Sequence, residues 1–126
     1  MSMRTPLKNV RRLGSAKEGA DHFWKQRVTA VANVFLGLFL VWLIASLIGA
    51  DYGTVKARIA NPAIALALIA LVISGTVHMR LGMQTIIEDY VHGEGSKVVL
   101  LVLNTFFAAS IALASIFAVL KISFGA

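Results

Sequence analysis

Residues 63–90 read AIALALIALVISGTVHMRLGMQTIIEDY, and the first 15 of them carry no charge. A helix rises about 1.5 Å per residue, so a helix from residue 63 to residue 87 is longer than a hydrocarbon core of about 30 Å. The stretch therefore predicts a transmembrane helix over residues 63–87 whose charged end emerges from the bilayer. Pro62, just before it, suits the first turn of a helix, because its missing N–H would be unpaired there anyway.

Two further runs have the same character. Residues 28–49 and residues 98–120 contain no charge, and Asn104, Ser110 and Ser115 are among the few polar residues of the second run. Between the runs, residues 50–61 are predicted to form a short polar connection, and residues 92–97, HGEGSK, a turn with two glycines. The sequence thus predicts an all-α membrane protein with three transmembrane helices, all within an anchor domain of residues 20–126.

Composition agrees with a membrane protein. Of the 126 residues, 58% are hydrophobic and only 14% are charged, whereas about a quarter are charged in ordinary soluble domains. The chain has no cysteine, so any iron–sulfur cluster would belong to another subunit. The net charge of +6 does not indicate nucleic-acid binding, because seven of the twelve Lys and Arg residues precede Val28, as membrane topology requires.

The basic N-terminal segment sets the expected orientation. Residues 1–19 are polar and predicted to be flexible, and Phe23 and Trp24 follow among charges, as at a headgroup layer. The positive-inside rule places the N-terminus in the cytoplasm, and three crossings place the C-terminus outside. Asp89 and Tyr90 then lie near the cytoplasmic interface, and His78 lies roughly 16 to 18 Å deeper along the same helix.

His78 is the candidate metal ligand. An ionisable residue at membrane depth is costly and marks a functional site. Gly75 and Gly82 share its helix face and leave the clearance that a flat macrocycle needs beside an axial ligand. A neutral imidazole suits haem iron; the alternative is an imidazole that hydrogen-bonds a neighbouring helix. His22 and His92 fall at the cytoplasmic boundary, so a second axial ligand would come from another chain, and the haem would lie between chains.

The adjacent Asp89 and Tyr90 form the second candidate site. A phenol donates a hydrogen bond to a carbonyl oxygen, and a nearby carboxylate takes part in proton delivery. At a membrane boundary these groups suit a lipid-soluble carbonyl compound such as a quinone. The alternative is that the tyrosine only marks the interface and the aspartate is only solvated.

The motif of the second helix resembles that of the smaller hydrophobic anchor subunit of succinate dehydrogenase, respiratory complex II. The resemblance is made by five residues at these spacings: His78, Gly82, Met83, Asp89 and Tyr90. It extends to the three-span layout and to the start of the first helix, where the matching residues are Arg27, Thr29 and Ala30.

The resemblance implies a role for each site residue. His78 would be an axial ligand of haem b, with Gly82 beside it and the other ligand supplied by the larger cytochrome b anchor subunit. Tyr90 would hydrogen-bond a ubiquinone carbonyl, and Asp89 would lie in the proton path. Arg27 would lie near the haem propionates or the quinone entrance, where a guanidinium suits carboxylates.

The resemblance also implies an assembly and a location. A flavoprotein subunit and an iron–sulfur subunit would oxidise succinate, a tricarboxylic acid cycle step, and pass electrons to ubiquinone. This chain would be a non-catalytic, multi-pass subunit of a heteromeric bundle in the lipid of the bacterial inner membrane. Two alternatives remain: the anchor of a fumarate reductase, and a small non-redox accessory subunit in which His78 only bridges helices.

Overall fold

The computed structural model describes residues 15–125, and every regular element in that range is a helix. Three helices are long: α2 (Ser15–Ser46), α4 (Pro62–Tyr90) and α5 (Glu94–Ser123). Each of them contains a segment long and apolar enough to cross a membrane. The predicted all-α membrane fold with three transmembrane helices is therefore confirmed.

The long helices extend beyond most of the predicted span limits. The exception is the end of the first span, predicted at residue 49, because α2 stops at Ser46 and Gly49 adopts a φ of 78° in the following turn. Glycine has no Cβ and tolerates this left-handed conformation. The second turn is shorter than predicted, since Gly93 is already the N-cap of α5 and Glu94 lies in its first turn. A negative side chain there is favoured by the positive end of the helix dipole.

The N-terminal segment, residues 1–19, is only partly within the described range. Helix α2 begins at Ser15, so the last five residues of the segment predicted to be flexible are helical. Residues 1–14 lie outside the described residues.

The connection predicted as a polar loop contains a further helix, α3 (Tyr52–Ala60). Its N-cap, Asp51, accepts hydrogen bonds from the backbone N–H and the hydroxyl of Thr54. These bonds favour the charged carboxylate, the hydroxyl most of all, and lower the pKa of Asp51. Asn61 closes α3 through its own N–H and caps α4 through its side-chain oxygen, and Pro62 occupies the first turn of α4 as predicted.

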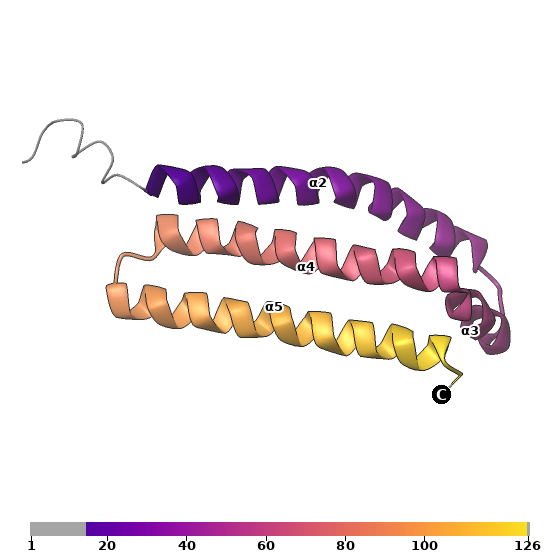
Figure 1. The fold of residues 1–126 in the computed structure, drawn as a ribbon. Coiled ribbons are helices and arrows are strands. Elements are labelled where there is room, and N and C mark those ends of the chain that lie inside the picture. The colour runs from indigo at the N-terminus through magenta and orange to yellow at the C-terminus, as the bar shows by residue number, and fades with distance from the viewer. Residues whose placement is uncertain (1–14, 126) are drawn as a thin grey trace, which may run out of the picture.

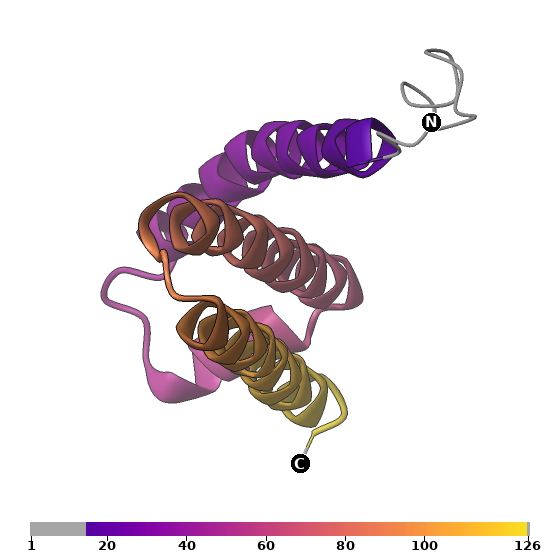
Figure 2. The ribbon, with the colours of Figure 1, turned by 90° about the vertical axis from the view of Figure 1, so that its left-hand side faces the viewer.

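The three long helices form a single open layer with α4 in the middle (Figures 1 and 2). Neighbouring long helices are antiparallel, so the end of α4 lies beside the start of α2 (Figure 1). Within residues 15–125, α4 contacts both other long helices, and α2 and α5 do not contact each other. Helix α3 packs across the far end, against α4 and α5.

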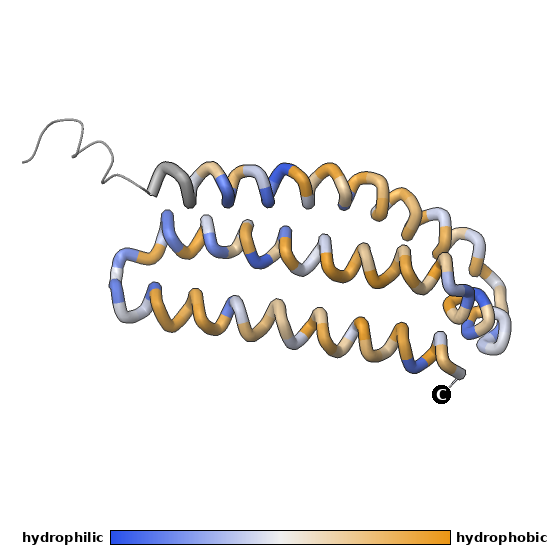
Figure 3. Tube along the Cα trace, viewed as in Figure 1, coloured by the Kyte–Doolittle hydropathy of each residue, from blue (hydrophilic) through white to orange (hydrophobic). Residues whose placement is uncertain are grey.

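A layer of this kind buries little of its own apolar surface. The buried hydrophobic side chains of the described residues are Leu43, Ala65, Leu81, Ile87 and Ala108. Large apolar side chains such as Phe35 and Leu113 are each 70% exposed. Hydrophobic residues cover most of the long helices, and polar ones gather at the ends of the layer (Figure 3). The exposed surface is therefore suited to lipid or to other membrane helices.

Helices α4 and α5 are joined by a polar contact. Asn104, 9% exposed, donates from its side-chain amide to the backbone carbonyl of Arg80 over 2.9 Å. The Nε of Arg80 donates in turn to the Thr105 hydroxyl over 3.2 Å. Interhelical bonds of this kind are worth about 0.6–2 kcal/mol in membranes.

We predict that Asn104→Leu lowers the midpoint of thermal unfolding of the detergent-purified protein, because it removes the hydrogen bond to the Arg80 carbonyl of α4. Ser110→Leu is the control, since it places the same side chain at an exposed position of the same helix. Equal midpoints for the two variants would contradict this role of Asn104.

Candidate functional site

The imidazole of His78 lies against α2, where it meets Thr29. The Thr29 hydroxyl oxygen is 3.1 Å from His78 Nδ1. One turn earlier on α4, the Ser74 hydroxyl donates to the backbone carbonyl of Thr29 over 3.3 Å. The two contacts fix the register of α2 against α4 at the level of the histidine.

The second ring nitrogen of His78 remains available. The imidazole is half-buried, and Nε2 has no hydrogen bond to any residue in the described part of the chain. Residues 15–125 contain no group of three or more His, Cys, Asp or Glu side chains that would hold a metal ion. His78 therefore has one ring nitrogen, Nε2, without a partner among the described residues.

The two glycines near His78 have different surroundings. A Cβ added at Gly82 would lie 3.5 Å from Nε2 of Gln26, which is ordinary van der Waals contact with α2. A Cβ added at Gly75 would meet nothing within 4 Å. Because Gly82 has no side chain, α2 can approach α4 closely at this position. Gly75 leaves open space one turn from the imidazole.

Several further polar side chains of α2 have buried atoms. His22 Nε2, Gln26 Oε1 and Asn33 Oδ1 are buried and have no hydrogen-bond partner within residues 15–125. With Thr29 they occur at intervals of four, three and four residues, which places them along one helix face. The sequence interpretation gave Gln26 no role and mentioned Thr29 only as part of a motif, although this spacing is visible in the sequence.

Asp89 and Tyr90 form a separate location. They are the last two residues of α4, both are exposed, and Tyr90 is 77% exposed. They follow His78 by 11 and 12 residues, which corresponds to about 16–18 Å along a helix. The structure therefore presents a half-buried imidazole and an exposed carboxyl–phenol pair as two sites on one helix.

Arg27 lies neither at His78 nor at the Asp89–Tyr90 pair. Its guanidinium carbon lies 4.8 Å from the centre of the Phe23 ring, a cation–π arrangement on α2. It borders a shallow hollow of about 230 Å³ with Trp24, Val28 and Val31. Because Arg27 and Thr29 differ by about 200° around the helix, the guanidinium lies away from the face that meets His78.

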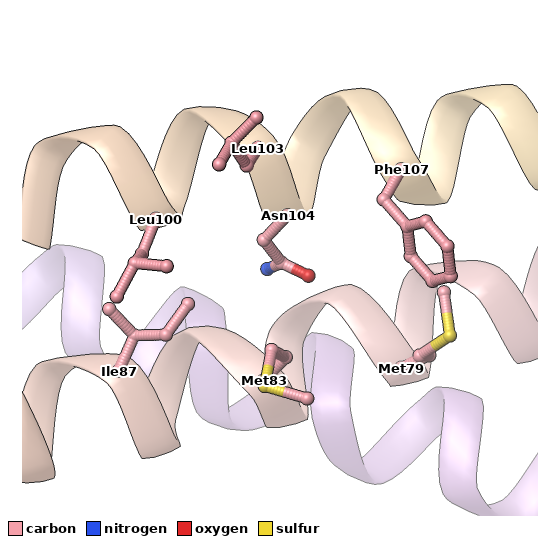
Figure 4. A pocket seen from close by; sticks show the side chains of 7 residues that line it. All are labelled: Met79, Met83, Ile87, Leu100, Leu103, Asn104 and Phe107. Atoms are coloured by element: carbon pink, nitrogen blue, oxygen red, sulfur yellow. The ribbon is translucent and has the colours of Figure 1, made fainter.

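The other side of α4 borders an apolar hollow of about 550 Å³ between α4 and α5 (Figure 4). It is lined by Met79, Met83, Ile87, Leu100, Leu103, Asn104 and Phe107. Asn104 is the only polar residue of this lining, and its amide already binds the Arg80 carbonyl. The hollow has the chemistry of a packing surface for apolar groups.

A family model described as the succinate dehydrogenase/fumarate reductase transmembrane subunit matches residues 1–118. The chain belongs to this family. It is 32% identical over 122 residues to the succinate dehydrogenase hydrophobic membrane anchor subunit of Paracoccus denitrificans, a match that covers 97% of this chain and 94% of the relative.

Two other members of the succinate dehydrogenase/fumarate reductase transmembrane subunit family match with similar identity. The hydrophobic membrane anchor subunit of succinate dehydrogenase from Rickettsia bellii is 32% identical over 88 residues, 70% of each chain. The succinate dehydrogenase membrane anchor subunit of Reclinomonas americana is 34% identical over 86 residues, 66% of this chain and 72% of the relative. No solved structure matches the chain significantly.

A side chain at position 82 of α4 would meet Gln26 of α2. Gly82→Leu places a large side chain where the Gln26 amide lies, and we expect it to separate α2 from α4 beside His78. The haem-to-protein ratio of the purified complex, measured by pyridine haemochrome absorbance, is then expected to fall at least several-fold. Gly82→Ala is the matched control, because its methyl group fits at 3.5 Å. Wild-type haem content in Gly82→Leu would show that this face of α4 is not the haem side.

Proposed function

We propose that this chain is the smaller membrane anchor subunit of a succinate:ubiquinone oxidoreductase, with half of a haem b site at His78 and part of a ubiquinone site at Tyr90. The observation that carries the proposal is the placement of His78 in a chain of this family. Its Nδ1 is engaged by α2, and its Nε2 has no partner among the described residues.

The anchoring role is supported by the shape of the chain. A single layer of three membrane-spanning helices with few buried apolar side chains is suited to pack against further transmembrane helices. Three buried polar atoms of α2 lack partners in the described part of the chain, and such atoms are costly in a membrane unless a neighbouring group or water binds them. We expect the larger cytochrome b anchor subunit to complete the bundle.

The residues present fit a haem. His78 would supply one axial nitrogen, and the open space beside Gly75 would receive part of the macrocycle. Gly82 would keep α2 close to α4 at the imidazole. A bound haem b would supply a one-electron redox centre. The second axial ligand would come from the partner anchor, so the haem would be shared between the two subunits.

Tyr90 and Asp89 would serve the quinone. The Tyr90 hydroxyl would donate a hydrogen bond to a ubiquinone carbonyl, and Asp89 would exchange protons with the reduced oxygen. Both side chains are exposed in this chain, which leaves them accessible to a ligand and to the iron–sulfur subunit. Arg27 would act at the quinone entrance or toward the haem propionates, although it lies away from the His78-facing side of α2.

The proposed complex also contains the flavoprotein subunit, which oxidises succinate. The N-terminus of this anchor would lie in the cytoplasm, and the membrane would be the bacterial inner membrane. Since α2 and α4 are antiparallel (Figure 1), the Asp89–Tyr90 end would face the cytoplasm as well. This is the side on which the soluble subunits would deliver electrons.

A fumarate reductase anchor is the second candidate, because the matching family includes both enzymes. The two run the same redox reaction in opposite directions. The residues described here do not favour one direction, and the named relatives are succinate dehydrogenase subunits.

The test of the haem assignment is the variant His78→Ala in the purified complex. We expect the Soret band of haem b to disappear, because one axial ligand is lost. His92→Ala is the control, since His92 is exposed in the turn between α4 and α5, and it is expected to keep the band. A wild-type complex without a Soret band would refute the haem assignment.

The test of the quinone assignment is Tyr90→Phe. One hydrogen bond is worth about 0.5–1.5 kcal/mol, so ubiquinone reduction is expected to fall about two- to tenfold. Succinate oxidation with an artificial electron acceptor should stay unchanged. Tyr52→Phe is the control, because Tyr52 is exposed at the start of α3, at the other end of the layer. Equal loss of both activities in Tyr90→Phe would indicate faulty assembly and contradict a quinone contact.

A further inference from the structure

The hydrogen bond between Thr29 and His78 has a direction that the surroundings of Thr29 determine. A neutral imidazole carries its proton on either Nδ1 or Nε2, and its partners decide which nitrogen holds it. A threonine hydroxyl has one proton to donate and two lone pairs to accept with. The direction of the bond therefore depends on which acceptor receives the single hydroxyl proton of Thr29.

The hydroxyl of Thr29 has two backbone carbonyls close to it. Its oxygen is 2.7 Å from the carbonyl oxygen of Lys25 and 3.1 Å from that of Gln26. The first distance is typical of an O–H···O hydrogen bond, and donation to the carbonyl four residues earlier is the usual arrangement of a threonine in a helix. The carbonyl of Lys25 thus receives the Thr29 proton.

The lone pairs of the Thr29 oxygen are then left to accept. The imidazole nitrogen 3.1 Å away, His78 Nδ1, must be the donor, and it must carry the ring proton. This leaves Nε2 unprotonated, with a lone pair in the plane of the ring. Only this tautomer binds iron through Nε2.

We infer that Thr29 is a positioning residue, which holds His78 in the tautomer and ring orientation that present Nε2 to haem iron. The inference rests on the proposed haem site. Ser74 supports the arrangement, because its hydroxyl donates to the Thr29 backbone carbonyl and fixes that residue against α4. Helix α2 thereby acts on a ligand that belongs to α4.

The Thr29 hydroxyl, as the acceptor of the Nδ1 proton of His78, would affect the midpoint potential of the haem. A group that accepts the second ring N–H of a histidine ligand raises the basicity of that ligand. A more basic imidazole stabilises ferric iron and lowers the midpoint potential. Removal of the hydroxyl is therefore expected to raise the potential and to release the ring from its fixed orientation.

The test uses Thr29→Val in the whole purified complex, because valine has nearly the shape of threonine but no hydroxyl. The measurements are the haem midpoint potential by redox titration and the g values of the oxidised haem by electron paramagnetic resonance. We expect an upward shift of the potential and a changed highest g value. Thr29→Ser, which keeps the hydroxyl, is expected to restore both.

The matched control is Thr76→Val. Thr76 lies on α4 two residues before His78, and its hydroxyl donates to the carbonyls of Val72 and Ile73 and not to the imidazole. This variant should leave the potential and the g values unchanged. If Thr29→Val does not assemble, Thr29→Cys replaces it, because a thiol is a weaker acceptor and should shift the potential in the same direction.

The outcomes separate this inference from the proposed function. A wild-type complex without haem would refute the haem site and the inference together. A wild-type complex with haem, and a Thr29→Val or Thr29→Cys variant with unchanged potential and g values, would refute the role of Thr29 alone.

Discussion

The contact between Thr29 and His78 determines how the polar and apolar parts of the helices line up. Thr29 is the second residue after Arg27, where the charged start of α2 gives way to its uncharged run. The 3.1 Å contact therefore places His78 beside the charged end of that run, whereas the sequence analysis predicted a deeper position. From this level α4 continues for 12 residues to Tyr90, beside the polar start of α2.

The central helix has two different interfaces. Toward α2 it presents Ser74, His78 and Gly82, which are polar or small and meet polar groups. Toward α5 it presents an apolar lining that includes Met79 and Met83. Association of helices in lipid depends on close packing and hydrogen bonds, because the lipid removes most of the hydrophobic driving force. Polar contacts therefore fix the register of α4 against α2. Toward α5, apolar packing is combined with the hydrogen bond from Asn104.

The sequence was sufficient for the number of spans, the start of α4 at Pro62 and the family, since these depend on long uncharged runs and on a motif of fixed spacing. It did not predict α3, because the cap that starts it is made by Asp51 and Thr54 within a segment that otherwise reads as a polar loop. The sequence analysis gave a hydrogen bond from His78 to a neighbouring helix as an alternative, but it identified neither Thr29 as the partner nor the placement of Arg27 away from that face. Both depend on the rotation of α2 about its axis, which the spacing of its polar residues indicates but which the sequence analysis did not use.

Because the long helices form a single layer, this chain alone would provide only part of a haem site. Helix α2 occupies one side of the imidazole, and Nε2 has no hydrogen-bond partner among the described residues. Another subunit would therefore have to complete a haem site at that nitrogen. The described residues include no other histidine at the level of His78, so a second histidine ligand would come from another subunit. Haem binding and subunit association would therefore stabilise each other by linkage, and loss of either would weaken the other.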